Sequence, residues 1–197
     1  LEGVRKIATD NNIVLIFDEC TSGFRETFGG LHKKYGVDPD MAVFGKALGN
    51  GYAITAVIGN REVMEETQST FISSTFWTER IGPMAALKTL DVMERKKSWE
   101  QITSTGKTIG NRWHALAEKH GLPIEISGLP ALVNFNIPVD NWLKYKTLIS
   151  QEMLKQGYLA TNSVYVCIEH TDQVVNAYFE KLDSVFSTIM DCENGRD

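Results

Sequence analysis

The chain has 197 residues, of which 43% are hydrophobic and 23% charged, and its formal net charge is −5. This composition is typical of a folded globular protein and argues against disorder. The acidic balance excludes the basic patch that a phosphate backbone attracts, so we expect no nucleic-acid partner. No apolar run approaches the roughly 18 residues of a membrane helix, so we expect no membrane partner either.

The cysteines are few and lie far apart in the sequence, at positions Cys20, Cys167 and Cys192. An odd number without a Cys-x-x-Cys pair argues against a disulfide framework and against a zinc site. The four histidines show no metal-ligand spacing either. We therefore expect a cytoplasmic protein without a bound metal.

In chain order, residues 1–8 predict the end of a helix. Its apolar face would consist of Leu1, Val4, Ile7 and Ala8. A continuous apolar run over residues 13–17 then ends in Asp18 and Glu19. Such a run predicts a strand that is buried on both faces of a parallel sheet, with ionisable groups at its carboxyl end.

A second apolar run, over residues 41–44, leads to Gly45 and Lys46. Two parallel strands joined by a right-handed crossover place their carboxyl ends on the same side of a sheet, where open α/β sheets bind ligands. We therefore expect Asp18 and Lys46 to converge on one small molecule. An amine that forms a Schiff base and a carboxylate that keeps a pyridine nitrogen protonated are what pyridoxal phosphate requires. On spacing alone, a helix-capping Asp and a solvated Lys remain the alternative.

Three blocks at fixed distances carry a family resemblance: LIFDECTSGFR at 15–25, GVDPD at 36–40 and FGKALGNG at 44–51. Together they resemble the signature of the class III pyridoxal-phosphate aminotransferases. The Gly-Phe-Arg variant and the following Gly29-Gly30 resemble the glutamate-1-semialdehyde aminomutase branch most. The resemblance implies a fold-type-I α/β transferase that works as a homodimer with shared sites. It also implies that this chain corresponds to the carboxyl-terminal half of such an enzyme.

The resemblance further implies roles for single residues. Lys46 would hold the cofactor and Asp18 its pyridinium, and Cys20 would pack against the ring from the same strand face as Asp18. Glu19 would lie beside the cofactor, with a solvated carboxylate as the alternative. Arg25 would bind a substrate carboxylate, with the fixing of a neighbouring loop as its alternative.

The stretch SSTFWTER at 73–80 departs from the family pattern. Relatives have a Gly-Thr pair followed by a Gly-Asn-Pro turn, and their Thr binds the cofactor phosphate of the neighbouring subunit. Thr75 occupies the position of that Thr. Trp77 and Glu79 replace the small turn, so we expect them to shape a different substrate pocket, with a surface ion pair as the alternative for Glu79.

Apolar residues at helical spacing predict a connector helix over 81–93, after which residues 94–97 are all charged. We place the domain boundary there, with residues 1–95 as part of the pyridoxal-phosphate-binding large domain and residues 96–197 as a small α+β domain. In the small domain we expect strands over 131–137 and 163–168. Helices are expected between 109 and 121, over 143–156, and after a Thr171 cap.

The sequence thus predicts a pyridoxal-phosphate-dependent aminotransferase that moves an amino group from a small-molecule amino donor to a keto or aldehyde acceptor. Two alternatives remain open. One is a glutamate-1-semialdehyde-type aminomutase, which returns the nitrogen to the same molecule. The other is a non-catalytic assembly module that has kept only the fold.

Overall fold

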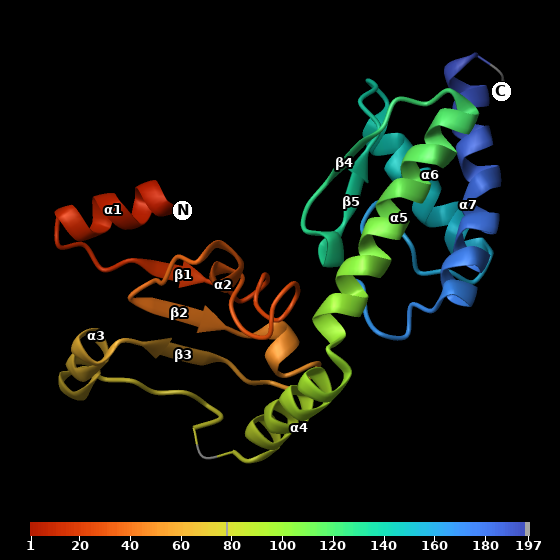
Figure 1. The fold of residues 1–197 in the computed structure, drawn as a ribbon. Helices are drawn as coiled ribbons and strands as arrows, with labels where there is room; N and C mark the ends of the chain where they lie inside the picture. Colours follow the sequence, from red (N-terminus) through yellow and green to blue (C-terminus); the bar gives the residue numbers. More distant parts are fainter. Residues whose placement is uncertain (78, 196–197) are drawn as a thin grey trace. The chain divides into compact units, whose positions relative to one another are not determined.

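The computed structural model describes residues 1–77 and 79–195. The chain divides into two compact units, Leu1–Glu100 and Gln101–Asp197 (Figure 1). None of the helices in the described residues combines the length and the apolar character that a membrane span needs.

The first unit contains a three-stranded sheet in the order β1-β2-β3. Strand β1 (Ile16–Asp18) pairs in parallel with β2 (Met41–Phe44), and Asp18 lies opposite Val43. Strand β3 (Ala56–Gly59) runs antiparallel to β2. The predicted parallel pair is therefore confirmed, and its two carboxyl ends lie at one edge of the sheet (Figure 1).

The Asp40 carboxylate fixes the start of β1 to the helix before it, α1 (Glu2–Asp10). Its Oδ2 atom accepts hydrogen bonds from the Leu15 amide at 2.7 Å and from Arg5 Nη1 at 2.9 Å. The hydrogen bond from the Leu15 amide is the largest cause that holds the pKa of Asp40 below its ordinary value, and the hydrogen bond from Arg5 is the next. Asp40 directly precedes β2, and its carboxylate binds the residue that directly precedes β1, so this contact fixes the starts of both parallel strands.

The expectation that residues 13–17 are buried on both faces is wrong. The side chains of Ile13, Val14 and Ile16 are each about half exposed, at 56%, 47% and 52%. Val4 and Ile7 of the predicted apolar helix face are exposed as well. These exposed apolar side chains form a surface that requires a partner to cover it, and no part of the described chain covers it.

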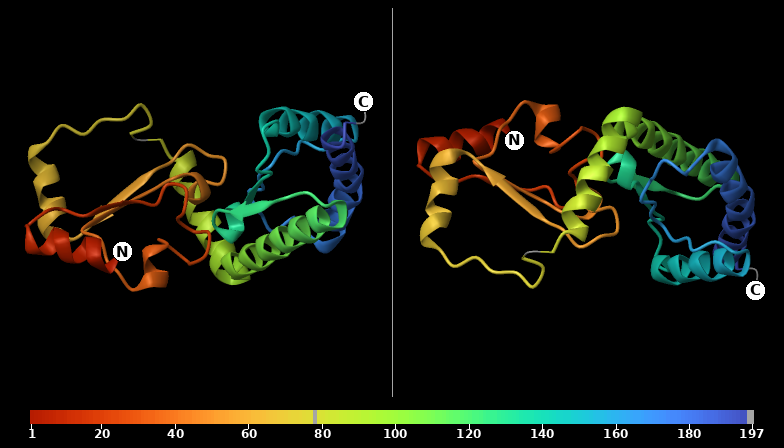
Figure 2. Two further views of the ribbon diagram at one scale, coloured as in Figure 1. Left: turned by 90° about the horizontal axis from the view of Figure 1, so that it is seen from above. Right: turned by 90° about the horizontal axis from the view of Figure 1, so that it is seen from below.

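Short helices and the connector helix complete the first unit. They are α2 (His32–Tyr35), η1 (Lys46–Leu48), α3 (Arg61–Glu65), η2 (Glu66–Ser69) and α4 (Ile81–Lys96). Gly36 ends α2 in the left-handed conformation, with φ of 64°. Both views of Figure 2 show the yellow segment of residues 70–77 running beside the sheet, and Phe71 in it is 95% exposed.

The second unit packs three helices around a β-hairpin. The helices are α5 (Ser98–His120), α6 (Trp142–Lys155) and α7 (Asp172–Glu193), and the strands are β4 (Glu125–Ser127) and β5 (Asn134–Asn136), with η3 (Pro130–Leu132) between them. Its core centres on Phe135, whose ring lies 4.7 Å from that of Trp113 and 5.8 Å from that of Phe186. The three predicted helices are confirmed, and Thr171 caps α7 by accepting a hydrogen bond from the Val174 amide.

The two predicted strands of this unit are shorter than expected. Only Asn134–Asn136 of the first forms a strand, and the second reduces to one bridge between Ser163 and Asn134. The Val164 and Val166 amides still donate to carbonyls of the first segment, at 2.9 and 3.0 Å. Backbone pairing is therefore present without a continuous ladder.

Candidate functional site

Asp18 ends β1 and Lys46 lies two residues after the parallel strand β2, and both side chains are exposed at the carboxyl edge of the sheet. Lys46 comes three residues after Val43, the register partner of Asp18. With strands about 4.8 Å apart and a rise of about 3.3 Å per residue, the two backbones lie within roughly 11 Å of each other. The side chains of an acid and an amine can both reach into that space.

The backbone of Lys46 is strained, because its φ is 43°, a left-handed value that residues other than glycine rarely adopt. Gly45 before it is extended, and η1 begins at Lys46 itself. Strained backbone of this kind clusters at functional sites, where the surrounding structure holds it in place. The Lys46 ammonium donates a hydrogen bond to the hydroxyl of Thr21.

A tight turn connects Asp18 to this hydroxyl. The Cys20 amide donates to Asp18 Oδ1 at 2.9 Å, and the Gly23 amide donates to the Glu19 carbonyl at 2.8 Å. Thr21 lies inside the turn and therefore faces Lys46 from the end of β1.

Glu19 is directed away from this edge and is only 4% exposed. Its carboxylate accepts hydrogen bonds from the Ser22 hydroxyl, the His32 amide at 3.0 Å and His32 Nδ1 at 3.1 Å. Burial raises the pKa of Glu19, but the hydrogen bonds from Ser22, His32 and Leu31 together outweigh it and lower the pKa. Glu19 is thus an anion that holds the turn and the start of α2 in place.

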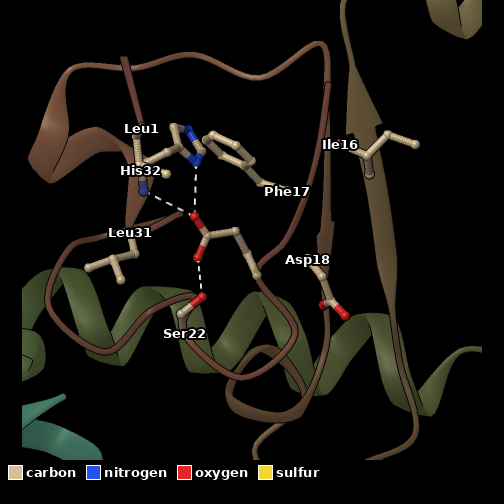
Figure 3. Close-up of a pocket in the computed structure, with 8 residues that line it drawn as sticks. Leu1, Ile16, Phe17, Asp18, Ser22, Leu31 and His32 are labelled. Atoms are coloured by element: carbon tan, nitrogen blue, oxygen red, sulfur yellow. Dashed lines mark hydrogen bonds and ion pairs between the residues drawn. The ribbon is translucent and has the colours of Figure 1, made fainter. Parts of the chain in front are cut away.

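Gly30 makes room for this pair, because a Cβ atom there would lie 2.3 Å from the His32 ring. Figure 3 shows the shallow hollow beside the pair, with Asp18 pointing away from Ser22 and His32. The hollow measures about 210 Å³. This is less than the roughly 300 Å³ of a small ligand pocket, and Lys46 does not line it.

Cys20 is half-buried against the backbone that leads to Lys46. A Cβ atom on Gly45 would lie 2.8 Å from Cys20 Sγ, so a side chain there would have to displace the thiol. Cys20 is thus a small side chain packed at the sheet edge just beyond β1, and its contact with the cofactor ring stays a prediction.

The predicted substrate residues Arg25 and Glu79 have partners within the chain. Arg25 Nε donates to the Thr21 carbonyl at 3.4 Å. The Glu79 carboxylate accepts hydrogen bonds from the Ile81 and Gly82 amides and thereby caps α4. The contact of Arg25 corresponds to the loop-fixing alternative for that residue, whereas the capping contact of Glu79 is neither the predicted substrate contact nor the surface ion pair.

Thr75 and Trp77 are exposed, Trp77 by 67%, on the segment between η2 and α4. In residues 1–77 and 79–195, no hydrogen bond or ion pair joins them to Asp18 or Lys46. Thr78, which belongs to the same divergent stretch, lies outside the described residues.

Two residues of this region were missed by the sequence reasoning. Thr21 contacts Lys46 and His32 contacts Glu19, and each pair lies more than ten positions apart in the chain. Alternation along β1 did carry one usable signal, since it places Glu19 on the face opposite Asp18 and Cys20.

The profile of the aminotransferase class III family matches residues 1–176. The chain belongs to the class III aminotransferases. Within this family it is similar to the 3-aminobutyryl-CoA aminotransferase of Cloacimonas acidaminovorans, with 36% identity over 88% of this chain and 43% of that protein. It is also similar to the glutamate-1-semialdehyde 2,1-aminomutase of Methanocaldococcus jannaschii, with 30% identity over 94% of this chain and 47% of that protein.

The fold agrees with that of a solved structure, the PLP internal aldimine form of the FumI protein from Sphingopyxis sp. MTA144. The TM-score is 0.89 at 22% identity, over 98% of this chain and 47% of that one. The architecture is therefore the α/β fold of class III aminotransferases, fold type I. The chain spans less than half the length of the relatives and solved structures that it matches.

The residues present fit pyridoxal phosphate. A carboxylate and an amine stand at neighbouring strand ends, and both are exposed. Gly45, between β2 and Lys46, carries no side chain, and the Cys20 thiol packs against it. Asp18 and Lys46 are the residues of this chain that would hold the group.

Proposed function

We propose that the gene product containing this chain is a pyridoxal-phosphate-dependent aminotransferase. It moves an amino group from an amino donor to a keto or aldehyde acceptor. One observation carries the proposal: β1 and β2 are parallel, with Asp18 at the end of β1 and Lys46 just after β2 at the same edge. Membership of the class III family supports the same conclusion.

Pyridoxal phosphate, when bound, supplies an aldehyde that captures amines and a ring that withdraws electrons from the substrate carbon. Lys46 would hold the aldehyde, and its amine would take a proton from the substrate carbon and return it as general base and acid. Asp18 would accept a charge-assisted hydrogen bond from the ring nitrogen, an interaction of about 1.5–3 kcal/mol. Its carboxylate is already oriented by the Cys20 amide.

The remaining predicted residues receive different roles. Cys20 packs beside the ring, and Thr75 binds the phosphate of a neighbouring subunit in a homodimer. Trp77 forms part of the substrate pocket. The hydrogen bonds of Glu19, Arg25 and Glu79 support positioning roles rather than direct contact with cofactor or substrate.

The test is the visible absorbance of the protein after incubation with pyridoxal phosphate. Lys46→Ala should abolish the yellow absorbance of the bound cofactor. Lys107→Ala, which changes an exposed lysine of α5, should retain it. An unchanged spectrum in Lys46→Ala would refute the assignment.

Aminomutation is the second candidate, and the similarity to the Methanocaldococcus jannaschii aminomutase favours it. The resemblance of residues 23–30 to that branch points the same way. Transamination consumes an added amino donor at every turnover, whereas aminomutation requires none. We favour transamination because the stretch at 73–80 differs from the relatives' pattern. One relative is named for 3-aminobutyryl-CoA, so β-amino acyl thioesters are the first amino donors to test.

A non-catalytic assembly module is the candidate from a different class. The exposed apolar side chains of Ile13, Val14 and Ile16 favour this candidate, because they require a partner that covers them. A gene product that assembles stably but neither captures pyridoxal phosphate nor turns over an amine would establish this reading. A colourless wild-type protein is therefore the result that separates the two classes.

A further inference from the structure

We propose that Thr21 is a positioning residue for Lys46, which holds the lysine amine at the carboxyl edge of the sheet through its hydroxyl. The inference rests on the proposed function, because it assigns a role in the capture of the cofactor by Lys46. Its basis is the hydrogen bond from Lys46 Nζ to Thr21 Oγ1, which spans 25 positions of sequence. Neither the family resemblance nor the spacing of charged residues pointed to Thr21.

The position of the Thr21 hydroxyl is set by the turn around it rather than by the side chain alone. The turn is closed by the bond from the Gly23 amide to the Glu19 carbonyl at 2.8 Å. Below it, the buried Glu19 carboxylate binds the Ser22 hydroxyl and the His32 amide. Arg25 Nε also donates to the Thr21 carbonyl. The residues on both sides of Thr21 are therefore fixed, and its hydroxyl is presented at one place.

The lysine needs such a partner because the rest of its surroundings leave it free. Its side chain is exposed, and long exposed lysine side chains sample many rotamers. Asp18 does not take this role, since its Oδ1 atom accepts from the Cys20 amide, and no hydrogen bond joins it to Lys46 within residues 1–77 and 79–195. The strained backbone at Lys46 fixes where the side chain starts, and Thr21 fixes where the amine ends.

A hydroxyl is suited to this task because it can accept a hydrogen bond from an ammonium and donate one to a neutral amine. It therefore holds Lys46 in both protonation states that the proposed proton transfer requires. A carboxylate in the same place would only accept and would favour the charged amine. Thr21 thus orients the amine without fixing its charge.

The experiment compares the rate at which the whole gene product captures pyridoxal phosphate, followed by stopped-flow absorbance, in three variants. Thr21→Val removes the hydroxyl at nearly constant volume, and Thr21→Ser retains it. Thr70→Val is the matched control, because that hydroxyl donates locally to the Thr67 carbonyl. We expect Thr21→Val to slow capture roughly fivefold to tenfold, the loss of about one hydrogen bond, with Thr21→Ser and Thr70→Val near wild type.

In steady-state turnover, Thr21→Val should lower kcat while the KM of the donor stays within about twofold, because Thr21 orients Lys46 and not the substrate. Urea midpoints within experimental error of wild type establish that the variants are folded. Capture by Thr21→Val at the wild-type rate would overturn the inference, and so would a Thr21→Ser variant as slow as Thr21→Val. A wild-type protein that captures no cofactor would instead overturn the proposed function, so the two failures are distinguishable.

Discussion

The buried carboxylate of Glu19 supports the turn on which Thr21 lies, and its replacement gives the sharpest stability prediction. Glu19→Gln keeps the volume and one acceptor oxygen but removes the charge. The oxygen can still accept from the His32 amide, and the Ser22 hydroxyl can rotate to accept from the new amide group. Hydrogen bonds to charged groups contribute about 1.5–3 kcal/mol and neutral ones about 1 kcal/mol, so losing the charge across these contacts should cost about 2 kcal/mol.

The effect should depend on pH. The folded-state pKa of Glu19 lies below its ordinary value of 4.5, so the ionised carboxylate stabilises the fold at pH values above 4.5. This contribution is lost as the pH falls from 4.5 through the lower, folded pKa. The difference in unfolding free energy between wild type and Glu19→Gln should therefore be largest near neutral pH and should shrink in acid.

Urea unfolding followed by tryptophan fluorescence at neutral pH and below pH 4 measures this difference. Glu180→Gln is the matched control, since that glutamate is exposed on α7 and its replacement should change stability by less than about 0.5 kcal/mol. Equal stability of wild type and Glu19→Gln at neutral pH would refute the reasoning. So would a difference that grows as the pH falls.

Three further predictions concern the same structure. Asp40→Asn should lower the unfolding free energy by about 1–2 kcal/mol in urea titrations, because the Leu15 amide and Arg5 lose a charged acceptor; an unchanged midpoint would contradict this. Lys46→Gly should be about 1 kcal/mol more stable than Lys46→Ala by calorimetry, the reverse of ordinary helical positions, because the φ of 43° favours glycine. Gly106→Ala should destabilise the second unit by more than about 2 kcal/mol, since the new Cβ would lie 1.8 Å from the Pro130 carbonyl oxygen. Gly3→Ala, with open space around it, should instead stabilise the protein by up to about 1 kcal/mol. Similar changes in unfolding free energy at both sites would contradict the packing.

Much of the fold could be predicted because its signals are local. The apolar runs at 13–17 and 41–44 predicted neighbouring parallel strands, and helical spacing predicted α4, α6 and α7. The burial of residues 13–17 could not be predicted, because a run of apolar residues reports the need for a partner and not its presence. The predicted strand at 163–168 was too long, because its apolar pattern does not report how many of its backbone groups pair, and only a few do.

The candidate site divides in the same way. Asp18 and Lys46 could be placed from strand ends and fixed motif distances. The contact between Thr21 and Lys46 could not, because it depends on how a turn directs one hydroxyl across 25 positions of sequence. The capping contact of Glu79 could have been predicted, since a carboxylate two residues before a helix is a common capping signal.

The central claim is that Lys46 is the residue that bonds to the cofactor. It is tested most directly by loading the whole gene product with pyridoxal phosphate, reducing it with borohydride and mapping the modified peptide by mass spectrometry. The account predicts a pyridoxyl group on Lys46. Modification at another lysine, with Lys46 unmodified, would contradict it.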